Sequence, residues 1–245
     1  MAAQRRSSPH PQRFVPRTST YKSLVAKLSS QVPNVSSPFA LSRRAGAPSA
    51  LDGKDILDRV LASLGLVSLL PLLLLIALAV RLDSKGPALF RQTRTGRNGK
   101  PFRIYKFRTM TVQENGPVVQ QATQGDKRVT RIGRILRQTS LDELPQLLNV
   151  IRGEMSLVGP RPHALAHDEH YGREIPDYVG RFTVKPGLTG WAQVNGSRGE
   201  TPTVADMRRR VELDLWYVQN RTLALDITIL VRTVVDEITR RTNAY

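Results

Sequence analysis

The sequence predicts a membrane-associated protein of mixed α/β type, rich in helices. Three observations lead to this fold class. An uncharged apolar run of 21 residues, Val60 to Val80, has the length of a membrane-inserted helix. A β-hairpin signal follows the run, and several later segments carry apolar residues at helical spacing. The 245 residues suit one medium domain with additions at its ends.

The composition restricts both the partners and the chemistry. A formal net charge of +17 indicates affinity for polyanions such as nucleic acid, anionic lipid or phosphorylated small molecules. The absence of cysteine excludes a disulfide framework, a thiol nucleophile and a cysteine zinc site, and it fits exposure to the cytoplasm. Residues 1–51 hold eight Lys or Arg and no acidic residue, which predicts a disordered basic tail. A transit peptide has a similar composition and stays an alternative.

Residues 52–84 are predicted to form the membrane-inserted helix. Their depth in the chain argues against a signal peptide. Pro71 lies in the middle of the apolar run, where it removes a backbone donor and predicts a kink. Ser68 is the nearby group expected to satisfy the backbone at this break. Hydropathy leaves open whether the helix spans the membrane or turns back within it.

The segment after the apolar run predicts a β-hairpin. Asn98-Gly99 is a strong turn signal, and Phe102 and Ile104 alternate on the return strand. Basic residues are dense here, which favours contact with phosphate or lipid headgroups over a merely solvated surface. These basic residues are Arg91, Arg94, Arg97, Lys100, Arg103, Lys106 and Arg108. Residues 111–127 are polar and contain glycine, so they predict a mobile loop.

Three later segments predict amphipathic helices suited to a membrane interface or to packing on the core. The first carries Val129, Ile132, Ile135 and Leu136 between arginines. The second begins near Leu141 and carries Leu144, Leu147, Leu148 and Ile151. The third is the C-terminal stretch LALDITILVRTVVDEITRR.

The stretch SLDE at residues 140–143 permits two interpretations. Ser140 and Glu143 have the spacing of a capping box, and Asp142 would then only favour the positive end of the helix dipole. Taken alone, the local pattern favours this cap over catalysis. Two rigid loops, SLVGPRP at 156–162 and VKPGLTGWAQVNG at 184–196, are of the kind that positions functional groups.

The stretch HALAHDEH places three histidines close together: His163, His167 and His170. Histidines at i and i+4 can share a helical face and bind zinc. Histidines in an acidic surface stretch are more often without a metal, so the surface interpretation is favoured here.

Three long motifs resemble one family, the bacterial sugar transferases, which are monotopic polyprenyl-phosphate phosphoglycosyl transferases. They are LDSKGPALFRQTRTGRNGKPFRIYKFRTM, RQTSLDELPQLLNVIRGEMSLVGPRP and VKPGLTGWAQVNG, and the resemblance runs from about Lys54 to Tyr245. The shorter stretches GPRPHALAHDE, NGSRGET and NAY are similar to the subgroup that initiates exopolysaccharides with glucose-1-phosphate.

The resemblance implies an enzyme that transfers a sugar-1-phosphate from a UDP-sugar to undecaprenyl phosphate and releases UMP. Asp142 would be the nucleophile that forms a covalent phosphosugar intermediate, and Glu143 with Asp142 would hold Mg²⁺. Arg137 would contact a phosphate. Carboxylate nucleophiles, Mg²⁺ and arginines suit attack on a charged diphosphate. Further candidates for binding the substrate are Lys106, Arg108, Arg161, Lys185 and Arg198.

The resemblance also implies an arrangement in the membrane. The helix in 52–84 would be re-entrant and broken at Pro71, and residues 85–245 would form a catalytic domain on the cytoplasmic face of a bacterial inner membrane. Its partners would be the UDP-sugar, undecaprenyl phosphate and membrane lipids, without nucleic acid, and a homodimer is one option. Two alternatives stay open: transfer of galactose-1-phosphate, and a non-enzymatic basic module that binds nucleic acid or lipid at a membrane.

Overall fold

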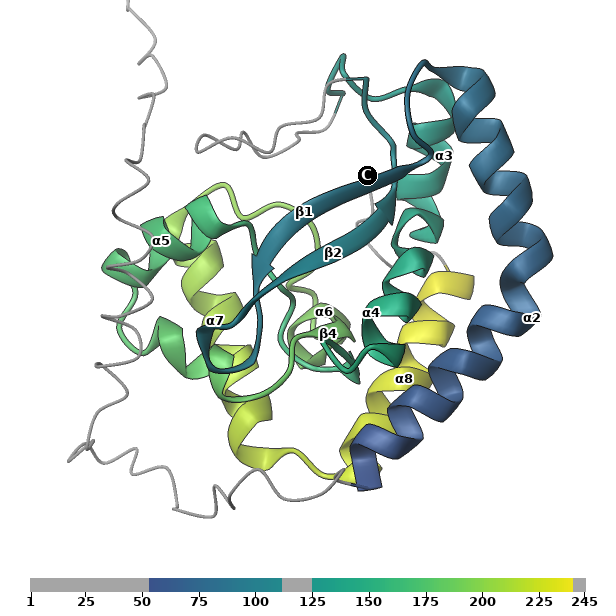
Figure 1. The fold of residues 1–245 in the computed structure, drawn as a ribbon. Helices are drawn as coiled ribbons and strands as arrows, with labels where there is room; N and C mark the ends of the chain where they lie inside the picture. Colours follow the sequence, from purple (N-terminus) through teal and green to yellow (C-terminus); the bar gives the residue numbers. More distant parts are fainter. Residues whose placement is uncertain (1–52, 112–124, 240–245) are drawn as a thin grey trace, which may run out of the picture.

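The computed structural model describes residues 53–111 and 125–239, so the predicted tail and most of the predicted loop at 111–127 lie outside the described residues. The described part is rich in helices and contains two small sheets, which confirms the mixed α/β class (Figure 1). The hairpin runs through the middle of the view. Helices α5 (Leu165–Glu174) and α7 (Val204–Asn220) lie on one side of it, and the long helix α2 (Gly53–Asp83) lies on the other.

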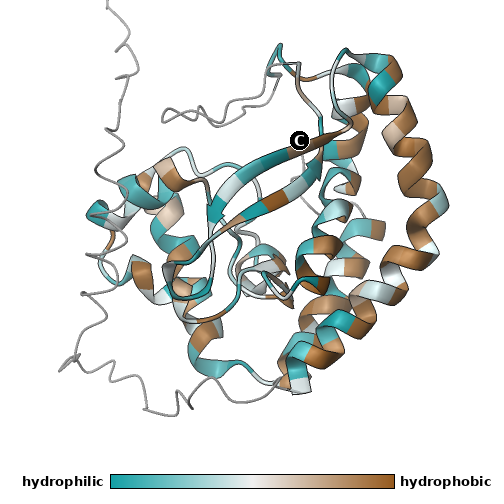
Figure 2. Ribbon diagram, in the orientation of Figure 1, coloured by the Kyte–Doolittle hydropathy of each residue, from teal (hydrophilic) through white to brown (hydrophobic). Residues whose placement is uncertain are grey.

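Helix α2 is the one helix of the described residues that is long and apolar enough to cross a membrane. Only 17% of its most apolar window is buried inside the protein, which distinguishes it from the core helix of a soluble domain. Figure 2 shows apolar residues along most of its length. Pro71 lies inside the helix, and the two halves of α2 lie at an angle to each other (Figure 1). The hydroxyl of Ser68 donates to the carbonyl of Gly65 at 3.0 Å.

That hydrogen bond differs from the expected role of Ser68. A proline at position 71 frees the carbonyl four residues earlier, which belongs to Val67. Ser68 instead bonds to a carbonyl that the helix already uses. The prediction of a proline-bent helix is thus supported, but its proposed hydrogen-bond compensation is wrong.

The predicted hairpin is confirmed. Strands β1 (Leu89–Thr95) and β2 (Pro101–Phe107) pair antiparallel, with Gln92 opposite Ile104. The short 3₁₀ helix η1 (Arg97–Gly99) joins them, and Asn98 and Gly99 both have positive φ, as the turn signal requires. Phe102 and Ile104 point into the core.

A second, two-stranded sheet was not predicted. Strand β3 (Ser156–Val158) pairs in parallel with β4 (Gly187–Thr189). Glycines permit this close approach, because a Cβ on Gly187 would lie 2.1 Å from the backbone nitrogen of Gly159. The two rigid loops singled out in the sequence thus lie against each other.

The three predicted amphipathic segments fold as helices, with one difference in type. Helix α3 (Arg131–Gln138) and helix α8 (Leu223–Ile238) are regular. The middle segment splits into the 3₁₀ helix η2 (Leu141–Gln146) and the short helix α4 (Leu147–Ile151). The remaining helices are η3 (Tyr178–Thr183) and α6 (Trp191–Val194).

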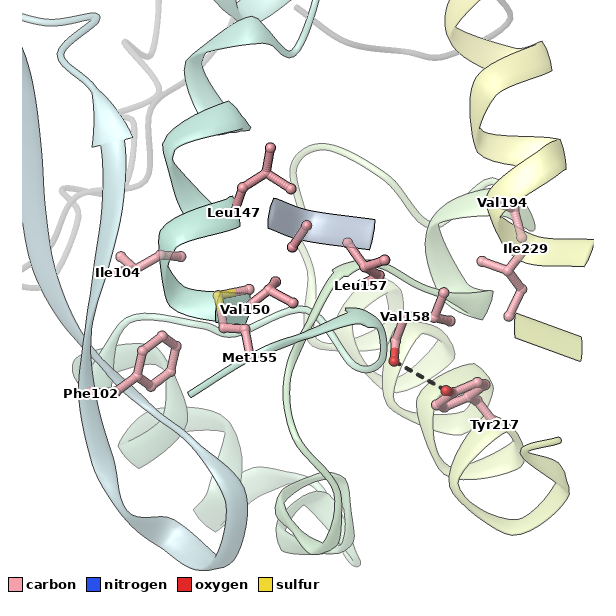
Figure 3. Packing of buried hydrophobic residues seen from close by; sticks show 11 residues of the cluster. Phe102, Ile104, Leu147, Val150, Met155, Leu157, Val158, Val194, Tyr217 and Ile229 are labelled. Atoms are coloured by element: carbon pink, nitrogen blue, oxygen red, sulfur yellow. Dashed lines mark hydrogen bonds between the residues drawn. The ribbon is translucent and has the colours of Figure 1, made fainter. Parts of the chain in front are cut away.

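The main core joins elements that are distant in sequence (Figure 3). Side chains of β2, α4 and β3 meet those of α7 and α8 there, and the hydroxyl of Tyr217 donates to the carbonyl of Val158 at 3.1 Å. The labelled members are Phe102, Ile104, Leu147, Val150, Met155, Leu157, Val158, Val194, Tyr217 and Ile229. Since β2 packs against η2 and α4 directly follows η2 in the chain, this core fixes the segment that carries Asp142 and Glu143.

Candidate active site

Residues Leu141–Gln146 fold as a 3₁₀ helix rather than the start of an α-helix. Pro145 has no N–H, so it cannot donate the bond to Leu141 that an α-helix needs at this point. Ser140 precedes the turn in the left-handed conformation, with φ of 53°, and its side chain caps nothing. The capping-box interpretation is therefore wrong, because Glu143 directs its carboxylate elsewhere.

The Glu143 carboxylate binds two cations. Its Oε1 accepts a hydrogen bond of 2.7 Å from Nζ of Lys106 on β2. The guanidinium of Arg161, which follows β3, donates to both carboxylate oxygens, with a distance of 2.9 Å from Nη1 to Oε2. Burial alone would raise the pKa of Glu143, but the charges of Arg161 and Lys106 outweigh it and hold the pKa well below its usual range.

The neighbouring Asp142 has the opposite environment. It is 9% exposed, and none of the described residues forms a hydrogen bond or ion pair with its carboxylate. Burial raises the pKa of Asp142 to about 6, although the charge of Lys106 opposes the shift. A buried carboxylate that is ionised near neutral pH and has no partner is available as a nucleophile. The two adjacent acids therefore differ in environment: Glu143 is held by two cations, and Asp142 has no hydrogen-bond or ion-pair partner among the described residues.

The carboxylate oxygens of Asp142 and Glu143 suit a hard cation such as Mg²⁺. Proteins bind Mg²⁺ through one or two carboxylates together with phosphate oxygens of the substrate. Lys106 and Arg161 use three of the roughly four acceptor positions of Glu143. Asp142 and the remaining position on Glu143 are the acidic ligands that such an ion would find in the described residues.

Two further predicted residues lie close to this pair. Arg137, at the end of α3, is near enough to affect the charge state of Asp142. The guanidinium of Arg198 donates to the hydroxyl of Ser140 and to Glu237 on α8. The structure thus brings four predicted residues around Asp142, namely Lys106, Arg137, Glu143 and Arg161, and Arg198 contacts Ser140 two positions before it.

Two other predicted residues do not belong to this group. Arg108 is 3% exposed, and its guanidinium donates to the carbonyls of Val80, Ser84, Lys85 and Gly86 at the end of α2. It caps that helix, so its assignment to the substrate is wrong. Lys185 donates to Asp55 at 2.6 Å and joins its loop to the beginning of α2. The charge of Lys185 therefore stabilises the contact with Asp55, and Lys185 is not among the cations that affect Asp142.

The histidines do not form one surface cluster. His163 is 6% exposed, and its Nδ1 lies 2.7 Å from the hydroxyl of Tyr178. The surface interpretation is therefore wrong for His163, whereas His170 is exposed. In the described ranges no group of three or more histidines and acids could hold a metal ion.

Sequence reasoning missed a buried polar cluster behind Arg161. It contains the buried acids Asp168 and Asp214 and the buried Arg181, and the half-buried Arg94 lies beside Asp168. Burial lowers the pKa of Arg94 to about 10, and burial raises that of Asp168 to about 6. Arg94 appeared in the basic hairpin, but its half-buried position could not be recognised without the partner helix α5.

Comparison with known proteins identifies the family of the chain. A sequence model described as bacterial sugar transferase matches residues 50–240. The UDP-glucose:undecaprenyl-phosphate glucose-1-phosphate transferase of Caulobacter vibrioides is 58% identical over 192 residues, which cover 78% of this chain and 72% of that protein. The Escherichia coli protein of the same name is 57% identical over 177 residues, 72% of this chain but only 38% of that protein.

A relative with another sugar in its name is also similar. The UDP-N-acetylgalactosamine-undecaprenyl-phosphate N-acetylgalactosaminephosphotransferase of Aeromonas hydrophila is 43% identical over 182 residues, 74% of this chain and 42% of that protein. The matched region includes the acidic pair, its cationic partners and the long apolar helix. This match, which covers most of the sequence, confirms the resemblance: the chain belongs to the bacterial sugar transferase family, and it is a transferase enzyme.

Proposed function

We propose that this enzyme transfers glucose-1-phosphate from UDP-glucose to undecaprenyl phosphate, releases UMP and so begins the synthesis of an exopolysaccharide. The names of the relatives at 57–58% identity support the donor, the acceptor and the sugar. The observation that carries the mechanism is the contrast between the two acids. Asp142 is buried, has a pKa of about 6 and has no hydrogen-bond partner within residues 53–111 and 125–239, while Glu143 is bound by Lys106 and Arg161.

In the first step a carboxylate oxygen of Asp142 attacks the β-phosphorus of UDP-glucose. The bond from that phosphorus to the bridging oxygen breaks, UMP leaves, and the glucose-phosphoryl group is carried as an acyl phosphate on Asp142. In the second step a phosphate oxygen of the lipid attacks the same phosphorus, which breaks the bond to Asp142 and restores the carboxylate. Splitting one displacement into two is the usual benefit of a covalent intermediate.

The cations around Asp142 would neutralise the diphosphate. Lys106 and Arg161 are fixed by Glu143, and Arg137 and Arg198 reach the same region from other elements. Fixed donors cost no reorganisation when charge develops on the phosphoryl oxygens. We assign Mg²⁺ to Asp142, the remaining acceptor position on Glu143 and the substrate phosphates. When bound, the ion would supply further charge neutralisation.

The membrane arrangement belongs to the same proposal. The acceptor is a lipid, so the site must lie at the bilayer surface, and α2 is the element that would insert. Its bend supports a re-entrant path, with both ends and the catalytic domain on the cytoplasmic side. Helix α8 exposes an apolar stripe that would rest in the interface, formed by Leu223, Ile227, Val231, Val234 and Ile238.

The proposed function is tested by measuring UMP release from purified protein in lipid, with undecaprenyl phosphate and Mg²⁺. A panel of UDP-glucose, UDP-galactose and UDP-N-acetylgalactosamine should give the fastest release with UDP-glucose. Faster release with another donor would contradict the assignment of the sugar. Release that is unchanged in Asp142→Asn would contradict the mechanism.

A further inference from the structure

A second arginine lies behind the proposed site and touches the backbone of Arg161. The guanidinium of Arg181, from η3, is 2% exposed. Its Nε donates to Oδ2 of Asp214 on α7 at 2.8 Å, and its Nη2 donates to the carbonyl oxygen of Arg161 at 2.7 Å. The buried guanidinium of Arg181 therefore connects helix α7 to the turn that carries Arg161.

The other edge of the Arg181 guanidinium is held as well. Nη1 donates to the hydroxyl of Tyr178 at 3.0 Å and lies 3.0 Å from Nδ1 of His163. The Tyr178 hydroxyl donates to Asp168 on α5 at 2.8 Å. Burial, followed by the charge of Arg181, holds the pKa of His163 well below its usual range, so this ring is neutral. The guanidinium has partners on three sides and little freedom to move.

The position of the Arg161 backbone determines where its guanidinium lies. Arg161 stands between Pro160 and Pro162, and prolines fix the backbone dihedral φ of the turn. Its side chain then reaches the Glu143 carboxylate with both nitrogens of the fork. A small displacement of this turn would lengthen both bonds, and misplacement of a binding group by about 1 Å can cost about 100-fold in rate.

We propose that Arg181 is a positioning residue for the transfer reaction, which acts by fixing the backbone of Arg161 and hence the guanidinium that faces the donor diphosphate. The inference rests on the proposed function of Arg161. It extends that proposal, because Arg181 itself does not contact Glu143 or Asp142 in the described residues. It also gives the buried residues Asp214, Tyr178 and His163 a shared task, which is to hold Arg181.

The test is a double-mutant cycle between Arg181→Lys and Arg161→Lys in the full-length protein in lipid. Lysine keeps the charge, but its compact ammonium group lacks the planar arrangement of donors of a guanidinium. It therefore cannot bond both Asp214 and the Arg161 carbonyl in the observed geometry. Arg181→Lys alone should lower kcat/KM for UDP-glucose by about 10- to 100-fold. In the Arg161→Lys background the same change should lower it by less than about twofold, because the guanidinium that Arg181 positions is gone.

Arg210→Lys provides the matched control. Arg210 is 4% exposed and donates to the carbonyls of Ser197 and Gly199 instead of Arg161. Arg210→Lys should change kcat/KM by the same factor in the wild-type and the Arg161→Lys backgrounds. Equal factors for Arg181→Lys in both backgrounds would overturn the inference and indicate a general structural role. If Arg181→Lys does not fold, Tyr178→Phe, which removes one acceptor of Arg181, should show the same non-additive behaviour with a smaller loss.

The cycle is also measured as the dissociation constant of UDP-glucose, by calorimetric titration of variants that all carry Asp142→Asn, so that no transfer to Asp142 accompanies binding. This readout separates the two proposals. Wild-type protein that binds UDP-glucose but releases no UMP would contradict the proposed function, while the binding cycle still decides the role of Arg181. Additive binding and rate effects with an active wild type would contradict the role of Arg181 alone.

Discussion

Replacing Asp142 by asparagine should stabilise the folded protein while it abolishes transfer. The reason is the environment of the carboxylate, which is buried, has no hydrogen-bond partner among the described residues, and has a pKa raised from 3.8 to about 6. Burial penalises the charged form, so an ionised Asp142 costs folding free energy at neutral pH. Asparagine has nearly the same shape and no charge.

The magnitude follows from the shift. About two pKa units, at about 1.4 kcal/mol each, correspond to about 3 kcal/mol as an upper limit. The folding free energy that the Asp142 charge costs depends on pH. Below the unfolded pKa of 3.8 the acid is protonated in both states, and the cost is zero. The cost grows between 3.8 and about 6 and is fully present above 6. At pH 7.5 the variant should therefore unfold at a higher temperature, by up to about 10 °C.

Glu143→Gln is the matched control, because it changes the adjacent residue in the same way. The pKa of Glu143 is held well below its usual value, so its charge stabilises the fold above its unfolded pKa of 4.5. Loss of this charge leaves Lys106 and Arg161 without their shared partner and should cost about 3 kcal/mol. Thermal unfolding at pH 7.5 and at pH 4 measures both variants. A destabilised Asp142→Asn, or an effect that is equal at both pH values, would refute the reasoning.

Three other predictions concern the pH profile, the end of α2 and the membrane face. The rate of UMP release should fall as pH decreases through about 6, since protonated Asp142 is no nucleophile, and a rate that is flat from pH 5 to 8 would contradict this. Arg108→Lys should lower the free energy of unfolding by roughly 2 kcal/mol, because Arg108 donates hydrogen bonds to carbonyls at the end of α2. The KM for UDP-glucose should stay unchanged, and a raised KM would indicate that Arg108 contacts the substrate. Replacing Ile227 and Val231 on α8 together by glutamate should reduce vesicle binding in a flotation assay about tenfold more than the control Asp236→Glu on the same helix. Equal binding of the two variants would show that α8 does not lie in the membrane interface.

Local signals in the sequence were sufficient for much of the fold. The Asn98-Gly99 turn, the apolar run around Pro71 and the apolar spacing of α3 and α8 each depend on residues close together in the chain. The parallel pairing of β3 with β4 could not be predicted in this way, because each strand has only three residues and the contact depends on facing glycines about 28 positions apart.

The site was predicted more by resemblance to a family than by local pattern. The spacing of Ser140 and Glu143 favoured a cap, and Pro145 with the left-handed Ser140 produced a 3₁₀ turn instead. Arg108 and Lys185 look like other surface cations in the sequence, and only the folded chain shows that each is used by an end of α2. Burial of Arg181 with Asp214 depends on α7, a helix that the sequence analysis did not identify.

The most direct test of the central claim is the detection of glucose phosphate on Asp142. The protein is incubated with UDP-glucose radiolabelled in glucose and with Mg²⁺, in lipid without undecaprenyl phosphate, and then digested and analysed by mass spectrometry. We predict release of UMP in amounts up to that of the enzyme, with the label on the peptide that contains Asp142, lost on addition of undecaprenyl phosphate and absent in Asp142→Asn. Turnover with both substrates but no label on the protein, or label on another residue, would contradict the account.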